Sequence, residues 1–255
     1  MKPPTLSDRL VVRDRPTYRS PLIYQNWRSL LFLHWEYNVE AIQNTLPEGL
    51  RVDTFAGKAY IGIVAFFMQD VHPRFLPTLP GLSHFQELNV RTYVYDDRGV
   101  PGVWFYSLDA NQWLAVQAAR MIFSLPYFYA KMRKEINPET NEIIYSSKRS
   151  GADPLSTTHF RYRPLLRAAI QRAEPNTLEF FLIERYVLFT YSNWSQRLFR
   201  ARVHHAPYPL VNVEANHSGK NMFSLNGISK PSGTYDHAIM SPGVDVEVFG
   251  LEPIA

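Results

Sequence analysis

Short hydrophobic runs separated by turn residues predict a chain built mainly of β-strands. Val, Ile, Tyr and Phe are enriched in these runs, and Gly, Pro, Asn or Asp separate them, which is typical of strands joined by tight turns. The expected strands cover residues 30–35, 51–55, 59–68, 87–95, 103–108, 127–132, 143–150, 157–163, 186–191, 198–204 and 244–249. The turn Asp-Asp-Arg-Gly at residues 96–99 is expected to join two of them as a hairpin.

Helical spacing is confined to a few segments. Asn38 is the expected N-cap of one short helix, and Thr177 that of another. A longer helix is expected over residues 110–124, with Asp109 as its N-cap and Gln112 at the capping-box position. These helices are too few to cover both faces of a large sheet.

The domain organisation follows from where this pattern begins. Residues 1–26 are rich in Pro, Arg and Ser, and they predict an irregular leader. Residues 27–255 contain no repeat, low-complexity tract or linker, so one domain with two or three helices on a strongly bent sheet is expected.

Composition narrows the classes of protein that need to be considered. The 255 residues include no cysteine, which excludes disulfides, a thiol nucleophile and thiolate metal sites. The net charge of +4 comes from scattered arginines rather than from one basic face, so nucleic acid is not an expected partner. With no signal-peptide core and no apolar run long enough to span a bilayer, a cytoplasmic protein with no membrane partner is expected.

The common catalytic motifs are missing from the sequence. It has no Gly-rich phosphate loop, no HExxH and no GxSxG. None of the eight histidines stands at a metal-ligand spacing from another histidine or a carboxylate. We therefore expect neither a metal nor a cofactor.

Arg120 interrupts an apolar stripe of the long predicted helix. Trp113, Val116, Arg120 and Phe123 share one helical face, so Arg120 is expected to point inward. A buried arginine needs a carboxylate, backbone carbonyls or an anionic ligand. A structural ion pair, a ligand-facing arginine and a side chain that reaches back to solvent all remain open.

A row of polar side chains begins at Glu87. By strand alternation, Glu87, Asn89, Arg91 and Tyr93 lie on one face of their strand. This face either contacts solvent or lines a polar pocket, in which case Arg91 is a candidate for ligand binding.

Six segments together resemble the YqjF-like family, a domain of unknown function. They are LFLHW at 31–35, LPEGLRVDTF at 46–55, AYIGIV at 59–64, LPG at 79–81, ELNVRTY at 87–93 and PGVWFYSLDA at 101–110. This family in turn resembles acetoacetate decarboxylase more distantly. The resemblance implies a cone-shaped antiparallel β-barrel around a pocket.

The resemblance also implies which pocket residues are kept and which are lost. The decarboxylase forms a Schiff base on a lysine, but Tyr127 and Phe128 occupy its lysine positions here, and a phenol cannot form an imine. Arg28 and Glu87 fall where the decarboxylase has a pocket arginine and a pocket glutamate. Arg120 also matches a helix arginine of that enzyme.

Three functions remain open from the sequence. In the first, the protein is an enzyme for a small anionic carboxylate or oxo-acid-like metabolite. Arg28 or Arg120 holds the anion, Glu87 is the general acid/base, and Tyr127 polarises a carbonyl. The second is a non-catalytic small-molecule-binding protein, and the third is a protein-interaction module. Homo-oligomers remain open in each case.

Two geometric expectations accompany these hypotheses. Arg120 and Glu87 are expected to line the same cavity, either paired directly or bridged through Tyr127 or a water. The loop at residues 71–82 carries three prolines and four large apolar residues. It is therefore expected to be a lid over the pocket or part of a subunit interface.

Overall fold

The computed structural model describes residues 2–153, 156–219, 221–231 and 233–254. Its helices are α1 (Leu6–Val11), α2 (Val39–Gln43), α3 (Trp113–Phe123), α4 (Leu178–Ile183) and α5 (Asn221–Ser224). Its strands are β1 (Ile23–Tyr37), β2 (Leu50–Val52), β3 (Ala59–Pro73), β4 (Phe85–Asp96), β5 (Pro101–Ala110), β6 (Tyr127–Ile136), β7 (Ile143–Arg149), β8 (Thr158–Pro164), β9 (Val187–Ser192), β10 (Arg197–His205), β11 (Val213–Ser218), β12 (His237–Val248) and β13 (Glu252–Pro253).

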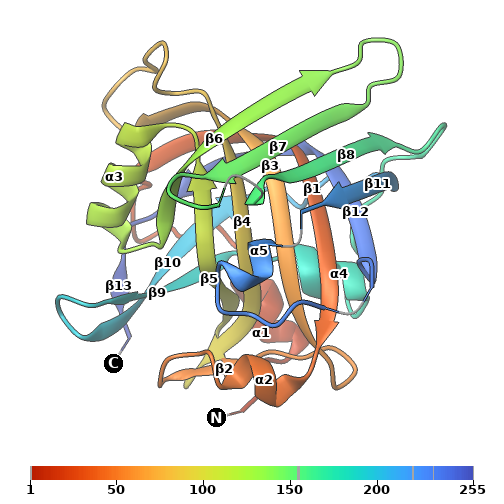
Figure 1. The fold of residues 1–255 in the computed structure, drawn as a ribbon. Helices are drawn as coiled ribbons and strands as arrows, with labels where there is room; N and C mark the ends of the chain where they lie inside the picture. The colour runs from red at the N-terminus through yellow and green to blue at the C-terminus, as the bar shows by residue number, and fades with distance from the viewer. Residues whose placement is uncertain (1, 154–155, 220, 232, 255) are drawn as a thin grey trace.

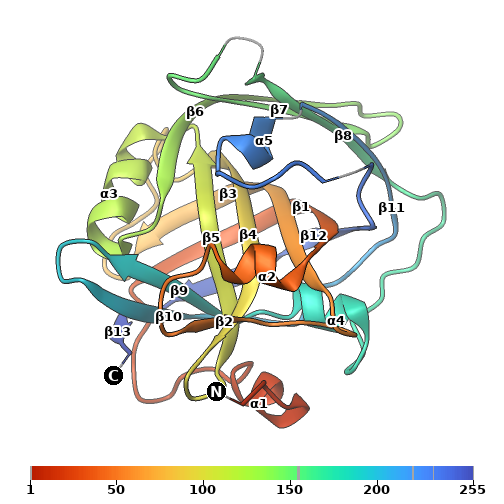
Figure 2. The same cartoon turned by 60° about the horizontal axis from the view of Figure 1, so that its bottom comes forward.

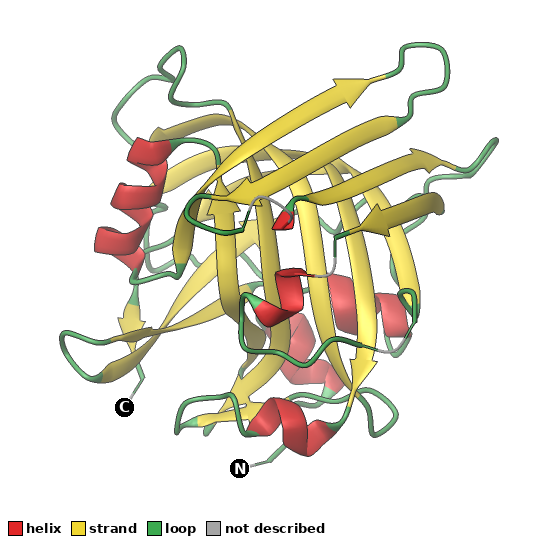
Figure 3. Cartoon of the chain, viewed as in Figure 1, coloured by secondary structure: helices red, strands yellow, loops and turns green. Residues whose placement is uncertain are grey.

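The fold is mainly β, with the helices at the periphery of one large sheet (Figures 1 and 3). The strand order is β11-β8-β7-β6-β5-β9-β10-β12-β1-β3-β4-β2, and β4 also pairs with β5. This extra pairing closes the ladder on itself from β5 through β9, β10, β12, β1, β3 and β4. Figure 2 shows these strands curving around the interior, with α3 beside β5 and β6.

The remaining strands form a second layer. Strands β6, β7, β8 and β11 cross the outer face of β1, β3 and β4 (Figure 1). Leu31, Ile63 and Val90 pack in a core cluster with Tyr145 and Phe160 of this layer. Strands β3 and β4 are therefore buried on both faces, which explains the nearly continuous apolar sequence of β3 from Ala59 to Met68.

A bulge in β1 decides which of its side chains face the interior. The register of β1 against β3 shifts between Arg28 and Leu31, and Ser29 has a φ of 52°. Because of the extra residue, Trp27 and Leu30 both line the interior, whereas Arg28 faces the other way.

Most expected strands are present, but several details differ from the sequence-based predictions. The leader contains α1, whose N-cap Thr5 forms a capping box with Asp8, and β1 begins before the leader ends. Residue Asp109 belongs to β5, and Gln112 caps α3 instead. The sheet is not wholly antiparallel, because β5 pairs in parallel with both β6 and β9. Strand β11 was not expected.

No helix among the described residues is long and apolar enough to span a membrane.

Candidate functional site

The closed part of the sheet surrounds a cavity of about 290 Å³. Most of its wall is apolar, supplied by side chains such as Phe66, Phe105, Leu108, Phe123 and Leu188. Its polar lining groups are Gln25, Trp27, Glu87, Asn89, Arg91, Tyr127, Arg185 and Tyr208. Such a wall, with a few convergent polar groups, is the usual form of a small-molecule site.

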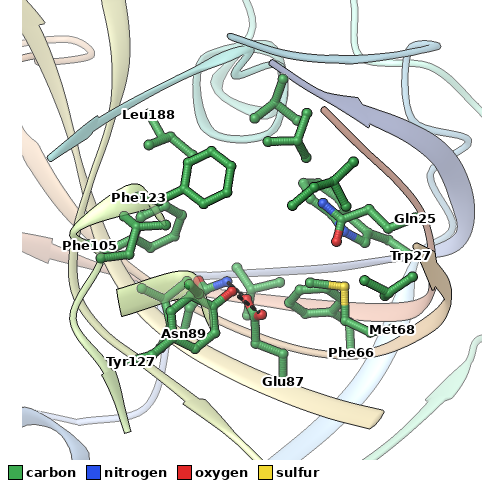
Figure 4. A pocket seen from close by; sticks show the side chains of 18 of the residues that line it. Gln25, Trp27, Phe66, Met68, Glu87, Asn89, Phe105, Phe123, Tyr127 and Leu188 are labelled. Atoms are coloured by element: carbon green, nitrogen blue, oxygen red, sulfur yellow. Dashed lines mark hydrogen bonds between the residues drawn. The ribbon is translucent and has the colours of Figure 1, made fainter. Parts of the chain in front are cut away.

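Glu87 and Tyr127 are hydrogen-bonded to each other at this cavity (Figure 4). The Tyr127 hydroxyl donates to Glu87 Oε2 at 2.7 Å, and Asn89 Nδ2 lies 3.4 Å from Glu87 Oε1. Glu87 is 2 % exposed and Tyr127 is 8 % exposed. The carboxyl group thus has two neutral donors and no bonded cation among the described residues.

Burial dominates the acidity of Glu87. Loss of hydration raises its pKa to about 7, while the hydrogen bonds from Tyr127 and Asn89 oppose this rise. Burial and the neighbouring carboxyl also raise the pKa of Tyr127 well above its ordinary value, so its phenol stays protonated. At neutral pH the pair therefore consists of a fixed donor and a carboxyl group that can both release and accept a proton.

Regular strands fix the positions of both Glu87 and Tyr127. Strand alternation turns Glu87 inward, and the Tyr145 hydroxyl, from the outer layer, donates to the Glu87 carbonyl oxygen at 2.8 Å. Tyr127 begins β6 after α3 and pairs with Leu108 of β5. The pair is thus held by regular strands rather than by loops.

Arg91 lines the cavity on the same face as Glu87. Its Nη2 donates to the Leu182 carbonyl oxygen at 3.2 Å, and its Nε has no partner among the described residues. The row predicted from alternation therefore faces the interior at Glu87, Asn89 and Arg91.

The expectation for Arg120 is wrong. Arg120 is exposed, does not line the cavity, and donates from Nε to the Tyr127 carbonyl oxygen at 2.7 Å. Its position at the edge of the apolar stripe lets the long side chain bend around the end of α3. Arg120 does not share the cavity of Glu87 or pair with it directly. The two residues are linked only through Tyr127, whose carbonyl oxygen accepts from Arg120 and whose hydroxyl donates to Glu87, so Arg120 is removed from the list of ligand-binding residues.

The expectation for Arg28 also fails. Its guanidinium bonds to the Val244 carbonyl oxygen at 2.9 Å and to Asp245 Oδ1 at 2.6 Å, outside the cavity. The bulge at Ser29 is the cause, because strict alternation back from Phe32 would have placed Arg28 inside.

Other cavity residues were missed by the sequence reasoning. Arg185 lines the cavity and is bonded to Asp53, which lies far away in the sequence. Gln25 and Trp27 lie on the same side of the cavity as Met68, opposite Phe105 and Phe123 (Figure 4), and the indole Nε1 of Trp27 has no partner among the described residues. No local pattern marks them, since Gln25 lies in the segment expected to be irregular.

Neither a metal site nor a Schiff-base lysine is formed by the described residues. They contain no group of three or more His, Asp or Glu able to hold a metal ion, and no lysine of theirs lines the cavity. Lys131, on β6, is exposed.

The segment at residues 71–82 contacts the cavity only at its beginning, in the last residues of β3. Val71 and Pro73 line the cavity, whereas Phe75 is 86 % exposed and Leu76 is 55 % exposed. Gln112 at the start of α3 donates to the Gly81 carbonyl oxygen, which ties the loop to the helix. Whether this loop closes over a ligand stays a prediction.

Comparisons with known proteins agree with this geometry at the level of the fold. The chain is 40% identical to the uncharacterized protein YqjF of Bacillus subtilis (strain 168) over 210 residues, 82% of this chain and 84% of that protein. An acetoacetate decarboxylase from Legionella pneumophila subsp. pneumophila str. Philadelphia 1 aligns with a TM-score of 0.64 at 12% identity, over 95% of this chain and 91% of that one. The enduracididine biosynthesis enzyme MppR, complexed with pyruvate, aligns with a TM-score of 0.62 at 11% identity, over 95% and 93%.

These structural neighbours share the acetoacetate-decarboxylase-like fold with this chain. The model of the DUF2071 family, described as an uncharacterized conserved protein, matches residues 24–245. The chain therefore belongs to the DUF2071 family.

Proposed function

We propose that this protein binds a small anionic metabolite, a carboxylate or oxo-acid-like compound, in the cavity and performs acid–base chemistry on it. One observation carries this assignment: Glu87 is a buried carboxyl group at the cavity wall whose pKa is raised to about 7. A carboxyl group costs stability when it is buried without a cation, and such groups cluster at functional sites. The enclosing strands would then correspond to the cone-shaped barrel of acetoacetate decarboxylase.

The chemistry follows from the protonation states of the pair. Ionised Glu87 would accept a proton from a carbon next to a carbonyl group, and protonated Glu87 would return it. Tyr127 would donate a hydrogen bond to the ionised carboxylate or to a carbonyl oxygen that takes up negative charge. Arg91 would attract the anionic group of the ligand.

A non-catalytic binding protein is the second candidate. The described residues that line the cavity include no Ser, Thr, Lys or His, so hydroxyl, amine and imidazole nucleophiles of these four types are missing from its wall. A protein that lost its nucleophile could keep the cavity and the ligand.

One set of measurements distinguishes an enzyme from a non-catalytic binding protein. The purified protein is mixed with a panel of oxo acids and saturated carboxylates, and the midpoint of thermal unfolding and the turnover are both recorded. For an enzyme, a compound raises the midpoint and is converted, and Glu87→Gln abolishes conversion while binding persists. The surface variant Glu139→Gln is the control and should behave like the wild type.

Binding without conversion by the wild type would select the binding protein. If no compound on the panel binds, both candidates for the cavity are wrong.

A further inference from the structure

A second polar group of the cavity consists of Arg91 and Arg185, which we call the guanidinium end. Both residues line the cavity and both are 8 % exposed. Arg91 stands four residues beyond Glu87 on β4, which places their Cα atoms about 13 Å apart. The guanidinium groups of both arginines approach the ring of Tyr93, at 5.6 Å and 5.0 Å, on the side away from Glu87.

The end of α4 holds both arginines in place. Arg91 Nη2 donates to the Leu182 carbonyl oxygen at 3.2 Å, and Arg185 Nε donates to the Phe181 carbonyl oxygen at 2.7 Å. Each arginine still has a buried nitrogen without a partner among the described residues, Nε in Arg91 and Nη2 in Arg185. Both guanidinium groups are thus fixed at the cavity by backbone carbonyl oxygens, and both keep hydrogen-bonding capacity that the described residues do not use.

The charges at this end do not balance within the described structure. Asp53 accepts hydrogen bonds from both Arg9 and Arg185, at 2.7 Å and 2.8 Å, while Arg91 has no carboxylate partner there. The buried carboxyl group of Glu184 is bonded instead to the backbone amide of Tyr208 and to the Tyr186 hydroxyl. Asp53 is thus shared by Arg9 and Arg185, Arg91 is bonded to no carboxylate of the described residues, and a buried charge is costly unless an anion offsets it.

Apart from Asn89, which lies between Glu87 and Arg91 on β4 and is bonded to Glu87, the wall between the two polar ends is mainly apolar. Phe32, Val64, Phe66, Leu108 and Leu188 line the cavity. The Cα atoms of Glu87 and Arg91 are about 13 Å apart, and the Arg91 guanidinium contacts Tyr93 and the Leu182 carbonyl oxygen. An anion at the guanidinium end would therefore hold a carbonyl group on its adjacent carbon away from Glu87.

We propose that Arg91 and Arg185 form an anion-binding subsite, and that the ligand carries its acid group and its reactive carbonyl or hydroxyl group at opposite ends of an apolar chain or ring. This inference rests on the proposed function and narrows its substrate class. Short oxo acids such as pyruvate and acetoacetate, in which the two groups are close together, are too short to span both sites. The ligand is instead a longer carboxylate, sulfonate or phosphate with an apolar body.

Calorimetric titration with a graded series tests the subsite. The probes are pyruvate, acetoacetate, 4-oxopentanoate, 6-oxoheptanoate and 4-oxo-4-phenylbutanoate, each with its methyl ester. Affinity for the wild type should increase with the spacing of the two groups and should fall about tenfold to a hundredfold for each ester. Arg91→Met should remove that difference between acid and ester, whereas Arg91→Lys should restore part of it.

Two further variants complete the design. Arg185→Met is expected to behave like Arg91→Met, but it leaves Asp53 with one arginine and can impair folding, so the Arg91 variants decide the outcome. Arg133→Met removes an exposed arginine of β6 outside the cavity and should bind every probe as the wild type does.

The possible outcomes show whether the subsite, the proposed function or both are wrong. If pyruvate binds as tightly as the longer acids and Arg91→Met binds all of them unchanged, while Glu87→Gln loses turnover, the subsite is wrong and the proposed function stands. If neither the acids nor the esters bind to the wild type, both are wrong.

Discussion

At the scale of single residues, Glu87 is subject to two opposing effects. Its two hydrogen bonds favour the carboxylate, and burial favours the neutral acid. Burial is the larger effect, so the pKa in the folded protein is about 7 against an ordinary value of 4.5. The unfolded chain releases this proton at a lower pH than the folded protein does. The contribution of Glu87 to the free energy of unfolding is therefore highest below about pH 4.5 and falls as the pH rises toward 7.

Substituting Glu87 by Gln should remove this pH dependence. From pH 4 to pH 9, the unfolding free energy of Glu87→Gln should rise relative to that of the wild type by about 3 kcal/mol, the equivalent of the pKa difference. Denaturant titrations at several pH values measure the change. Glu139→Gln, at an exposed position, should show a constant difference. A constant difference for Glu87→Gln as well would mean that its carboxyl group titrates normally.

Tyr127→Phe should raise the pKa of Glu87 further. The substitution removes the hydroxyl that donates at 2.7 Å to the carboxylate, so the ionised form loses its better hydrogen bond. The carbon-13 chemical shift of the labelled carboxyl group, followed against pH, should titrate at a higher pH than in the wild type. Tyr129→Phe, on an exposed residue of the same strand, is the control. An unchanged or lower titration midpoint would contradict the assigned donor.

Single residues also show how much of this site could be predicted from the sequence. Strand alternation correctly predicts that Glu87, Asn89 and Arg91 share one face, because β4 pairs with β3 there without a register shift. This face lines the cavity. Arg28 could not be placed correctly, because one extra residue at Ser29 reverses the faces of β1. Arg185 could not be found at all, since its partner Asp53 comes close only in the folded chain.

At the scale of elements, caps and turns were more predictable than strand ends. Asn38 and Thr177 cap their helices, and the turn after Asp96 joins β4 to β5, because each depends on local chemistry. The start of α3 was misjudged because Asp109 is held by Arg149 in a buried ion pair, with an Nη2 to Oδ1 distance of 2.8 Å. Long-range pairing outweighed the local capping preference.

Gly243→Ala should damage the pairing of β1 with β12. Gly243 has a φ of 147°, and an added Cβ would lie 2.2 Å from the Trp27 carbonyl oxygen, beside the bulge that shapes the cavity wall. We expect the unfolding free energy to fall by about 3 kcal/mol, as for severe overpacking. Gly57→Ala is the matched control, because Gly57 also has a positive φ but nothing within 4 Å. Equal losses in both variants would assign the effect to backbone strain alone.

At the scale of the whole molecule, closure of the sheet could not be derived from the hydrophobic pattern. The pattern indicates many bent strands, but the pairing of β4 with β5 and the parallel return through α3 to β6 depend on contacts between distant elements. The family resemblance supplied the enclosing fold, and that fold explains why β4 can carry polar side chains on a buried face. They line a cavity inside the molecule rather than a solvent-exposed face.

The absence of a lysine among the described cavity residues leads to a prediction for the intact protein. An imine needs an amine within reach of the bound carbonyl group, and the side chain that hydrogen-bonds to Glu87 at the cavity is the phenol of Tyr127, which cannot form one. Treatment with sodium borohydride in the presence of acetoacetate or pyruvate should therefore leave the intact mass unchanged, and so should the longer oxo acids. An acetoacetate decarboxylase treated in parallel is the positive control. A stoichiometric adduct, mapped by peptide mass spectrometry to Lys131, Lys58 or any other lysine, would contradict the acid–base assignment and return the protein to Schiff-base chemistry.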